Sequence, residues 1–137
     1  MEKLHILVSA TDKNFGAVSQ SNDINGVVVA TGKTLEELKS EFESALAFHI
    51  KGCVEDGDSF PEYILQEKYE LVYDLDISAL LLKMDGIVTL AAISRATGIN
   101  QKQLGHYRSG IKEPRALQRQ KIIDGIHHIG QELISVV

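Results

Sequence analysis

The sequence TLAAISRATGINQKQLGHYRSG, residues 89–110, decides the fold of the C-terminal half of this chain. Thr89 is suited to cap a first helix, because its hydroxyl can accept a hydrogen bond from a free N–H of the first turn. Gly98 can end that helix in the left-handed conformation, and Asn100 can cap a second helix two residues later. We therefore predict two helices joined by a tight turn, as in a helix-turn-helix.

The predicted second helix has an apolar side and a polar side. Leu104 and Tyr107 face inward, and Ile99 fills the corner between the two helices. The polar side is suited to DNA, since glutamine and lysine side chains can pair with adenine and guanine edges in the major groove. The candidate base-reading residues are Gln101, Lys102, Gln103 and His106. Gly105 costs about 1 kcal/mol relative to alanine, which predicts a short helix or a close approach of its backbone to the groove.

Two further helices are predicted around this pair. Asp76 can cap a helix that stops at Gly86, and Glu113 with Pro114 marks the start of a long final helix. Basic residues that follow the polar helix are placed to contact DNA phosphates. The candidate phosphate contacts are Arg108, Lys112, Arg115 and Arg119. The final helix stays apolar up to residue 137, which predicts burial against a second copy of the chain or against the N-terminal half.

Charge divides the chain in the same way. Residues 1–74 carry six Lys against fourteen Asp and Glu, a net charge of −8. Residues 75–137 carry eight Lys and Arg against five Asp and Glu, a net charge of +3. This asymmetry indicates two modules, an acidic one for a basic partner and a basic one for a polyanion.

The acidic half has the pattern of a mixed α and β domain. Residues 4–8, 15–20 and 27–32 predict three strands, and residues 69–73 predict a fourth. Between the third and fourth strands, Thr34 and Glu37 form a capping box that begins an amphipathic helix. This helix should end between Gly52 and Gly57, so the predicted order of elements is βββαβ.

Segments of both halves resemble known families. Residues 34–38 (TLEEL), 45–46 (AL) and 55–61 (EDGDSFP) look like the helix and exit loop of HicB antitoxins. Residues 89–110 resemble the helix-turn-helix of the lambda-repressor-like, or Xre, family. The resemblance implies an α+β protein with a truncated ribonuclease-H-like βββαβ domain over residues 1–74. An all-α helix-turn-helix bundle would follow over residues 75–137.

The same resemblance implies a function. HicB proteins neutralise HicA, a small basic ribonuclease toxin, and repress their own operon by binding double-stranded operator DNA. On the acidic helix, Glu36, Glu41 and Glu43 are the candidate toxin-facing residues. We expect a non-enzymatic antitoxin with no catalytic residues, no metal and no cofactor. A homodimer or higher homo-oligomer is expected, because one helix-turn-helix contacts too few bases and dimers bind two half-sites.

Two other classes of function remain open. A nuclease tethered to DNA would need carboxylates that hold two metal ions, but residues 4–8 carry none, and Asp12 and Asp23 lie in turn-like sequence. A transcription regulator is the other class, with an N-terminal domain that binds a small ligand or only oligomerises. A neighbouring gene for a short basic protein would favour the antitoxin.

Composition also predicts where the protein acts. No apolar run approaches the roughly 18 residues of a membrane helix, and residues 1–5 lack the basic and apolar segments of a signal peptide. Cys53 is the only cysteine, so no disulfide forms within the chain, and we expect it to be a small buried side chain. His49 lies on the apolar side of the acidic helix, as a core or boundary histidine does. We expect a cytoplasmic protein with no membrane partner.

Overall fold

The computed structural model describes residues 1–11 and 13–137, and these residues form two compact units. Unit 1 comprises Met1–Ser9 and Lys13–Asp76, and unit 2 comprises Ile77–Val137 together with Ala10 and Thr11. Asp12, which the sequence pattern places in a turn, lies outside the described residues. A mixed sheet accompanied by helices makes the fold α+β, as predicted.

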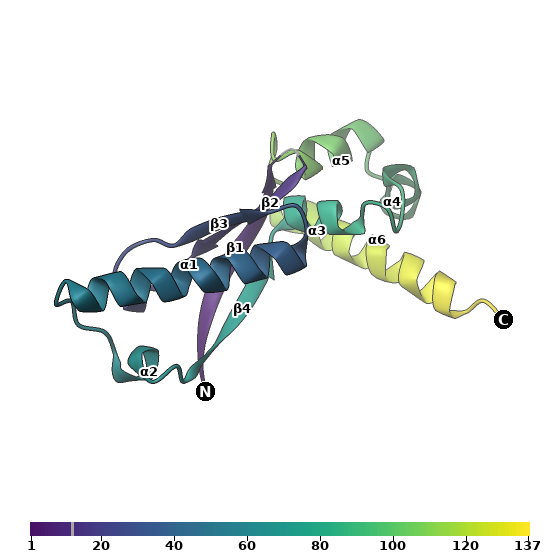
Figure 1. The fold of residues 1–137 in the computed structure, drawn as a ribbon. Coiled ribbons are helices and arrows are strands. Elements are labelled where there is room, and N and C mark those ends of the chain that lie inside the picture. The colour runs from purple at the N-terminus through teal and green to yellow at the C-terminus, as the bar shows by residue number, and fades with distance from the viewer. Residues whose placement is uncertain (12) are drawn as a thin grey trace. The chain divides into compact units, whose positions relative to one another are not determined.

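Within the described residues, unit 1 contains a sheet of four strands in the order β3-β2-β1-β4 (Figure 1). The strands are β1 (Glu2–Thr11), β2 (Asn14–Ser19), β3 (Val29–Gly32) and β4 (Tyr69–Leu75). β1 pairs in parallel with β4, and β2 pairs antiparallel with β3. Leu4, Ile6 and Val8 are buried at alternate positions of β1, because successive side chains of a strand point to opposite faces. β4 is the last strand in the order β3-β2-β1-β4, so it is an edge strand of this sheet.

Helix α1 (Leu35–Glu55) packs along one face of the sheet (Figure 1). The Thr34 side chain accepts a hydrogen bond from the Glu37 N–H at 3.0 Å, which confirms the predicted cap. Leu38, Phe42 and Leu46 are buried at helical spacing. Gly32 lets the sheet and helix approach closely, because a Cβ at this position would lie 2.6 Å from the backbone nitrogen of Leu38.

Strand pairing explains where the predicted boundaries in unit 1 were wrong. β1 begins at Glu2, not residue 4, because Glu2 pairs with Tyr69. β4 continues to Leu75, which pairs with Val8, and so extends two residues past the predicted end at residue 73. β3 begins at Val29, where its pairing with β2 begins. The short helices η1 (Asn22–Ile24) and α2 (Glu62–Leu65) lie in connections that the sequence pattern left as loops.

The described elements of unit 2, apart from the end of β1, are α-helices. They are α3 (Ile77–Met84), α4 (Leu90–Thr97), α5 (Gln101–Arg108) and α6 (Ala116–Ile134). Their buried side chains form one apolar cluster, consisting of Ile77, Leu81, Ile93, Ile99, Leu104, Tyr107 and Ile122. α6 begins at Ala116, not at the predicted Glu113 and Pro114, because Arg115 still has an extended backbone with ψ of 163°. None of the helices within the described residues is long and apolar enough to cross a membrane.

Candidate functional site

Helices α4 and α5 meet at a tight turn over residues 98–100. The Thr89 hydroxyl accepts a hydrogen bond from the Ala92 N–H at 3.0 Å, and Gly98 has a left-handed backbone with φ of 75°. The Asn100 side chain accepts a hydrogen bond from the Lys102 N–H at 2.8 Å. All three predicted features of the helix pair, two caps and a turn glycine, are confirmed.

Side-chain hydrogen bonds also hold the corner between these helices. The Ser94 hydroxyl donates to the carbonyl oxygen of Ile99 at 2.6 Å. The Thr97 hydroxyl donates to the carbonyl oxygen of Ile93 at 2.7 Å and accepts from the Ile99 N–H at 3.1 Å. Because each of these bonds restrains the turn, the direction in which α5 leaves α4 is fixed by the local sequence.

The predicted base-reading residues fall into two pairs. Gln101 and Lys102 are exposed at the start of α5. Gln103 is partly buried, and its side-chain amide donates to the Tyr107 hydroxyl at 2.9 Å. His106 is partly buried too, and its Nδ1 has no hydrogen-bond partner among the described residues. Gln101 and Lys102 are therefore the two that are free to reach a ligand without leaving a contact of the fold.

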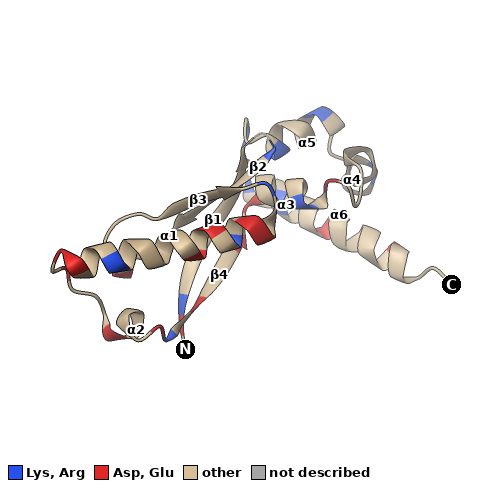
Figure 2. Ribbon diagram, viewed as in Figure 1, with Lys and Arg blue, Asp and Glu red and all other residues tan. Residues whose placement is uncertain are grey.

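Basic residues surround the end of α5 and the start of α6 (Figure 2). Lys112, Arg115 and Arg119 are exposed, as phosphate contacts must be. Arg108 forms an ion pair with Asp85, with an N···O distance of 3.3 Å. An ion pair this exposed contributes about 0–1 kcal/mol, so little opposes its replacement by a phosphate.

Helix α1 of unit 1 carries acidic residues along its length (Figure 2). Glu36, Glu41 and Glu43 are all exposed. Phe48 was missed by the sequence analysis, yet it is 81% exposed and lies seven residues after Glu41, on the same side of the helix. Its place out of phase with the buried positions Leu38, Phe42 and Leu46 could have identified it. An exposed aromatic ring is the type of side chain that anchors protein interfaces.

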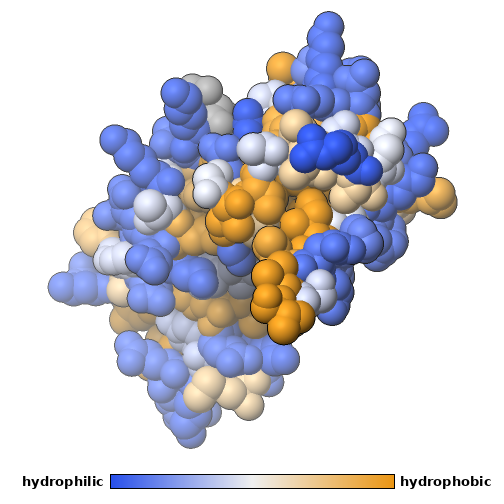
Figure 3. All heavy atoms as spheres, turned by 90° about the vertical axis from the view of Figure 1, so that its right-hand side faces the viewer, coloured by the Kyte–Doolittle hydropathy of each residue, from blue (hydrophilic) through white to orange (hydrophobic). Residues whose placement is uncertain are grey.

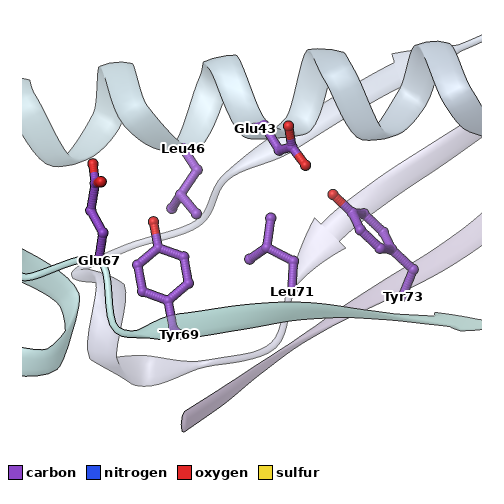
Figure 4. A pocket seen from close by; sticks show the side chains of 6 residues that line it. All are labelled: Glu43, Leu46, Glu67, Tyr69, Leu71 and Tyr73. Carbon is purple, nitrogen blue, oxygen red and sulfur yellow. The ribbon is translucent and has the colours of Figure 1, made fainter. Parts of the chain in front are cut away.

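A pocket of about 360 Å³ lies between α1 and β4 (Figure 4). Side chains from α1, from β4 and from the loop before β4 line it, namely Glu43, Leu46, Glu67, Tyr69, Leu71 and Tyr73. Of these, the sequence analysis proposed only Glu43. The alternation of Tyr69, Leu71 and Tyr73 on one face of a strand could have indicated a shared surface. Glu67 could not be predicted, because its place depends on a left-handed backbone with φ of 54°.

The two tyrosines of this pocket titrate above their ordinary range. Burial raises the pKa of Tyr73 to about 12, and the nearby charge of Glu43 adds to this effect. Burial also raises the pKa of Tyr69, as do the charges of Glu67 and Glu43. Both phenols therefore stay protonated and neutral at neutral pH.

The other polar residues that the sequence analysis singled out have structural contacts. His49 Nε2 lies 2.6 Å from the carbonyl oxygen of Ile24 and 2.9 Å from that of Asn25, so it fastens α1 to the loop after β2. Cys53 is partly buried, and burial together with the charge of Asp58 raises the pKa of its thiol. Within residues 1–11 and 13–137, no group of three or more His, Cys, Asp or Glu side chains is placed to hold a metal ion.

No protein-family model, curated protein or solved structure matches this chain. The resemblance to HicB and Xre proteins, and the ribonuclease-H-like character of unit 1, stay predictions from the sequence.

Proposed function

We propose that this protein is a HicB-type antitoxin that acts in the cytoplasm and also represses its own operon. Unit 2 would bind double-stranded operator DNA, and unit 1 would neutralise a small basic ribonuclease of the HicA type. Helices α4 and α5 carry this proposal, because both are capped by side chains and meet at a left-handed glycine. The exposed Gln101 and Lys102 at the start of α5 are suited to base edges.

Gly105 supports the same orientation of α5. A Cβ at this position would meet no atom of the protein within 4 Å, so packing inside unit 2 does not require glycine there. A glycine in a helix nevertheless costs about 1 kcal/mol relative to alanine. Packing does not explain the glycine at this position, whereas close approach of the α5 backbone to DNA would explain it.

The acidic surface of α1 supports a basic protein partner for unit 1. Glu36, Glu41 and Glu43 are exposed on this helix, and residues 1–74 have a net charge of −8. Opposite charge speeds the association of two proteins, and the exposed Phe48 offers an apolar anchor on the same side of α1 as Glu41. We infer that unit 1 is a binding domain and that the protein is not an enzyme.

The apolar end of α6 supports self-association. Leu133, Ile134 and Val136 are exposed, with Ile134 at 79%. Figure 3, viewed from the side on which the C-terminus lies, shows apolar residues gathered in a band. Burying such a surface against a second copy would pair two helix-turn-helix units, as binding to two half-sites requires.

The DNA-binding half of the proposal is tested with a labelled duplex from the promoter of this gene. Four phosphate contacts, by Arg108, Lys112, Arg115 and Arg119, give an expected slope of log Kd against log salt concentration of about 3.6 per protomer. Affinity that does not change with salt would contradict the proposal, and so would equal affinity for an unrelated duplex.

The toxin-binding half is tested by co-expression with a neighbouring gene for a short basic protein, if the operon has one, followed by measurement of the affinity. The triple variant Glu36→Lys, Glu41→Lys and Glu43→Lys should slow association with that protein, because it reverses exposed charges. The triple variant Lys112→Glu, Arg115→Glu and Arg119→Glu is the matched control and should leave capture intact. Unchanged association of the first variant would place the interface elsewhere.

A transcription regulator that binds a small ligand is the second candidate function. The pocket between α1 and β4 favours it, since about 360 Å³ lies within the range of ligand pockets, roughly 300 to 1,000 Å³. The two functions separate in the co-expression experiment, because a ligand-binding regulator would not capture the basic neighbour.

A further inference from the structure

The pocket of unit 1 lies at the edge of the sheet. β4 is the last strand in the order β3-β2-β1-β4, and α1 packs mainly over β3 and β2. The helix and the edge strand therefore leave space between them, into which side chains of both elements project (Figure 4).

The two ends of the pocket are negative and its middle is apolar. Figure 4 shows Glu67 beside Tyr69 and Glu43 beside Tyr73, with Leu46 and Leu71 between them. The raised pKa of each tyrosine reflects a negative environment as well as burial, because the neighbouring carboxylates disfavour a phenolate. Such a lining suits a ligand with a positive group and a short apolar stem.

The hydroxyl of Tyr73 is also left without a partner. Its oxygen is buried and accepts or donates no hydrogen bond among the described residues. Buried polar atoms of native proteins are nearly always paired, so an unpaired one at a pocket indicates a partner that comes from outside. In Figure 4 this hydroxyl points from β4 toward α1, on the side of Glu43.

The ring of Tyr73 already contacts a cation. The ammonium nitrogen of Lys39 lies 5.2 Å from the centroid of this ring, within the range of a cation–π interaction. Lys39 is not among the residues that line the pocket, and no described ion pair joins it to Glu43. Lys39 itself occupies this place at the Tyr73 ring, so a ligand cation would bind on the side of the Tyr73 hydroxyl and Glu43.

From these contacts we propose that the pocket is a binding site for an arginine side chain of the basic partner protein. This inference rests on the proposed function. A planar guanidinium has five N–H donors in a fixed fork, which can serve Glu43 and the unpaired Tyr73 oxygen together at one end of the pocket, while Glu67 adds negative charge at the other end. The methylene stem would lie against Leu46 and Leu71. A lysine ammonium is a compact charge without this planar fork, so it would serve the Glu43 carboxylate and the Tyr73 oxygen less well.

The chemistry of the site is tested on the full chain with N-acetylarginine methylamide, observed through backbone amide shifts. N-acetylcitrulline methylamide has nearly the same shape without the charge, and the lysine analogue has the charge without the plane. We expect saturable shifts around Glu43, Tyr69 and Tyr73 with the arginine probe, smaller ones with lysine and none with citrulline. Equal binding of citrulline would overturn the proposal.

The protein variants carry matched controls. Glu43→Gln should weaken binding of both the arginine probe and the basic partner by about tenfold, the value of one charge-assisted hydrogen bond. Glu67→Gln should weaken both by less, because Glu67 acts only through its charge from the other end of the pocket. Glu70→Gln should change neither by more than about twofold, because Glu70 is exposed at the next position of β4, on the opposite face. Glu67→Gly removes the carboxylate but suits the left-handed backbone, so it should weaken binding as Glu67→Gln does and fold at least as well as the parent.

The outcomes separate this inference from the proposed function. If the basic partner binds the Glu43→Gln and Glu67→Gln variants as tightly as the parent, the inference is wrong and the antitoxin function stands. If the chain binds the arginine probe but captures no basic protein, the proposed function is wrong, and so is the inference that the arginine belongs to a partner protein. Tight binding of free arginine would also contradict the inference that the arginine belongs to a partner protein. It would support a transcription regulator that binds a small ligand.

Discussion

Helices α1 and α5 begin alike and then present opposite charge. Each follows a polar residue, Thr34 or Asn100, whose side chain accepts a hydrogen bond from an N–H of the first turn. The exposed side chains of α1 include Glu36, Glu41 and Glu43, whereas α5 begins with Gln101 and Lys102. A cap therefore sets where a helix starts, and the exposed residues that follow set what the helix can bind.

The two units also use glycine differently in their packing. In unit 1, Gly32 brings a strand against the backbone of α1, so the close contact is between main chains. In unit 2, Gly125 of α6 faces the Thr97 side chain of α4, so the contact is between a helix and a side chain. Backbone atoms can move less than a side chain without disturbing the fold. We therefore expect the largest loss of stability at Gly32.

Gly32→Ala should destabilise unit 1 by about 3 kcal/mol, the upper part of the range for an overpacked core. The added Cβ would lie 2.6 Å from the nitrogen and 2.8 Å from the Cα of Leu38, and neither atom can move without displacing the start of α1. Gly125→Ala should cost less, about 1–3 kcal/mol, because its contact is Thr97 Cγ2 at 2.4 Å.

Urea unfolding of each variant, followed by circular dichroism and by promoter binding, measures both effects. If the units fold independently, Gly32→Ala loses capture of the basic partner at a lower urea concentration than the parent while its promoter binding is unchanged, and Gly125→Ala does the reverse. Gly16→Ala is the control in unit 1, since the nearest atom to its Cβ would be 4.0 Å away. Loss of both activities in both variants would show that the units fold as one.

The next effect concerns the surface of α5. Gln101→Ala or Lys102→Ala should lower the affinity for the promoter by about 1–3 kcal/mol, because contacts to base edges provide discrimination. Gln101→Ala should leave nonspecific binding nearly unchanged, whereas Arg115→Ala should weaken binding to all duplexes alike. Competition between promoter and unrelated DNA measures the difference. An unchanged preference in Gln101→Ala would mean that α5 does not read the sequence.

Local chemistry explains how much of this surface could be predicted. The Thr89 and Asn100 caps and the Gly98 turn depend on residues at most three positions apart, and all were predicted correctly. Gln103 was placed with the DNA-reading residues, but its hydrogen bond to Tyr107 depends on the rotamers of both side chains. Sequence periodicity assigns a residue to a face of a helix and does not determine which contacts it makes there.

Unit 1 shows the same limit for contacts made across the fold. The amphipathic pattern of residues 35–53 predicted a helix with one apolar side, and Leu38, Phe42 and Leu46 are buried at its spacing. The pocket was missed, because it needs β4 to be an edge strand and Glu67 to adopt a left-handed backbone. Strand order is set by pairing between distant segments, and the order βββαβ is compatible with more than one arrangement of strands.

A smaller effect distinguishes two helix glycines. Gly105→Ala in α5 and Gly130→Ala in α6 should each stabilise the protein by about 0.5–1 kcal/mol, because a Cβ at either position would meet no protein atom within 4 Å. Only Gly105→Ala should weaken promoter binding, if the α5 backbone approaches the DNA. Thermal unfolding and promoter titration of the two variants provide the comparison. Equal promoter affinity for both would show that α5 does not approach DNA at this position.

The smallest effect at neutral pH comes from Tyr73→Phe in the pocket of unit 1. The hydroxyl has no partner among the described residues, so its removal should leave stability unchanged or raise it by a few tenths of a kcal/mol to about 1 kcal/mol. At alkaline pH the difference should grow. The pKa of Tyr73 in the folded protein is raised to about 12, above the ordinary tyrosine value of 10.0, so the unfolded chain loses this proton first.

The sign of this alkaline effect follows from proton binding. Between pH 10 and about 12 the folded state holds more protons than the unfolded state, so the free energy of unfolding falls as pH rises, and the contribution is complete below pH 10. In Tyr73→Phe the free energy of unfolding should therefore fall less steeply over this pH range. The fall that is due to Tyr63, whose pKa is also raised to about 12, should remain. Chemical unfolding at a series of alkaline pH values, with phenolate absorbance as a second observable, measures the difference between the two curves. If the parent and Tyr73→Phe declined in parallel, Tyr73 would titrate as an ordinary tyrosine. The pocket would then lack the buried, negative character that distinguishes it from the cationic surface of α5.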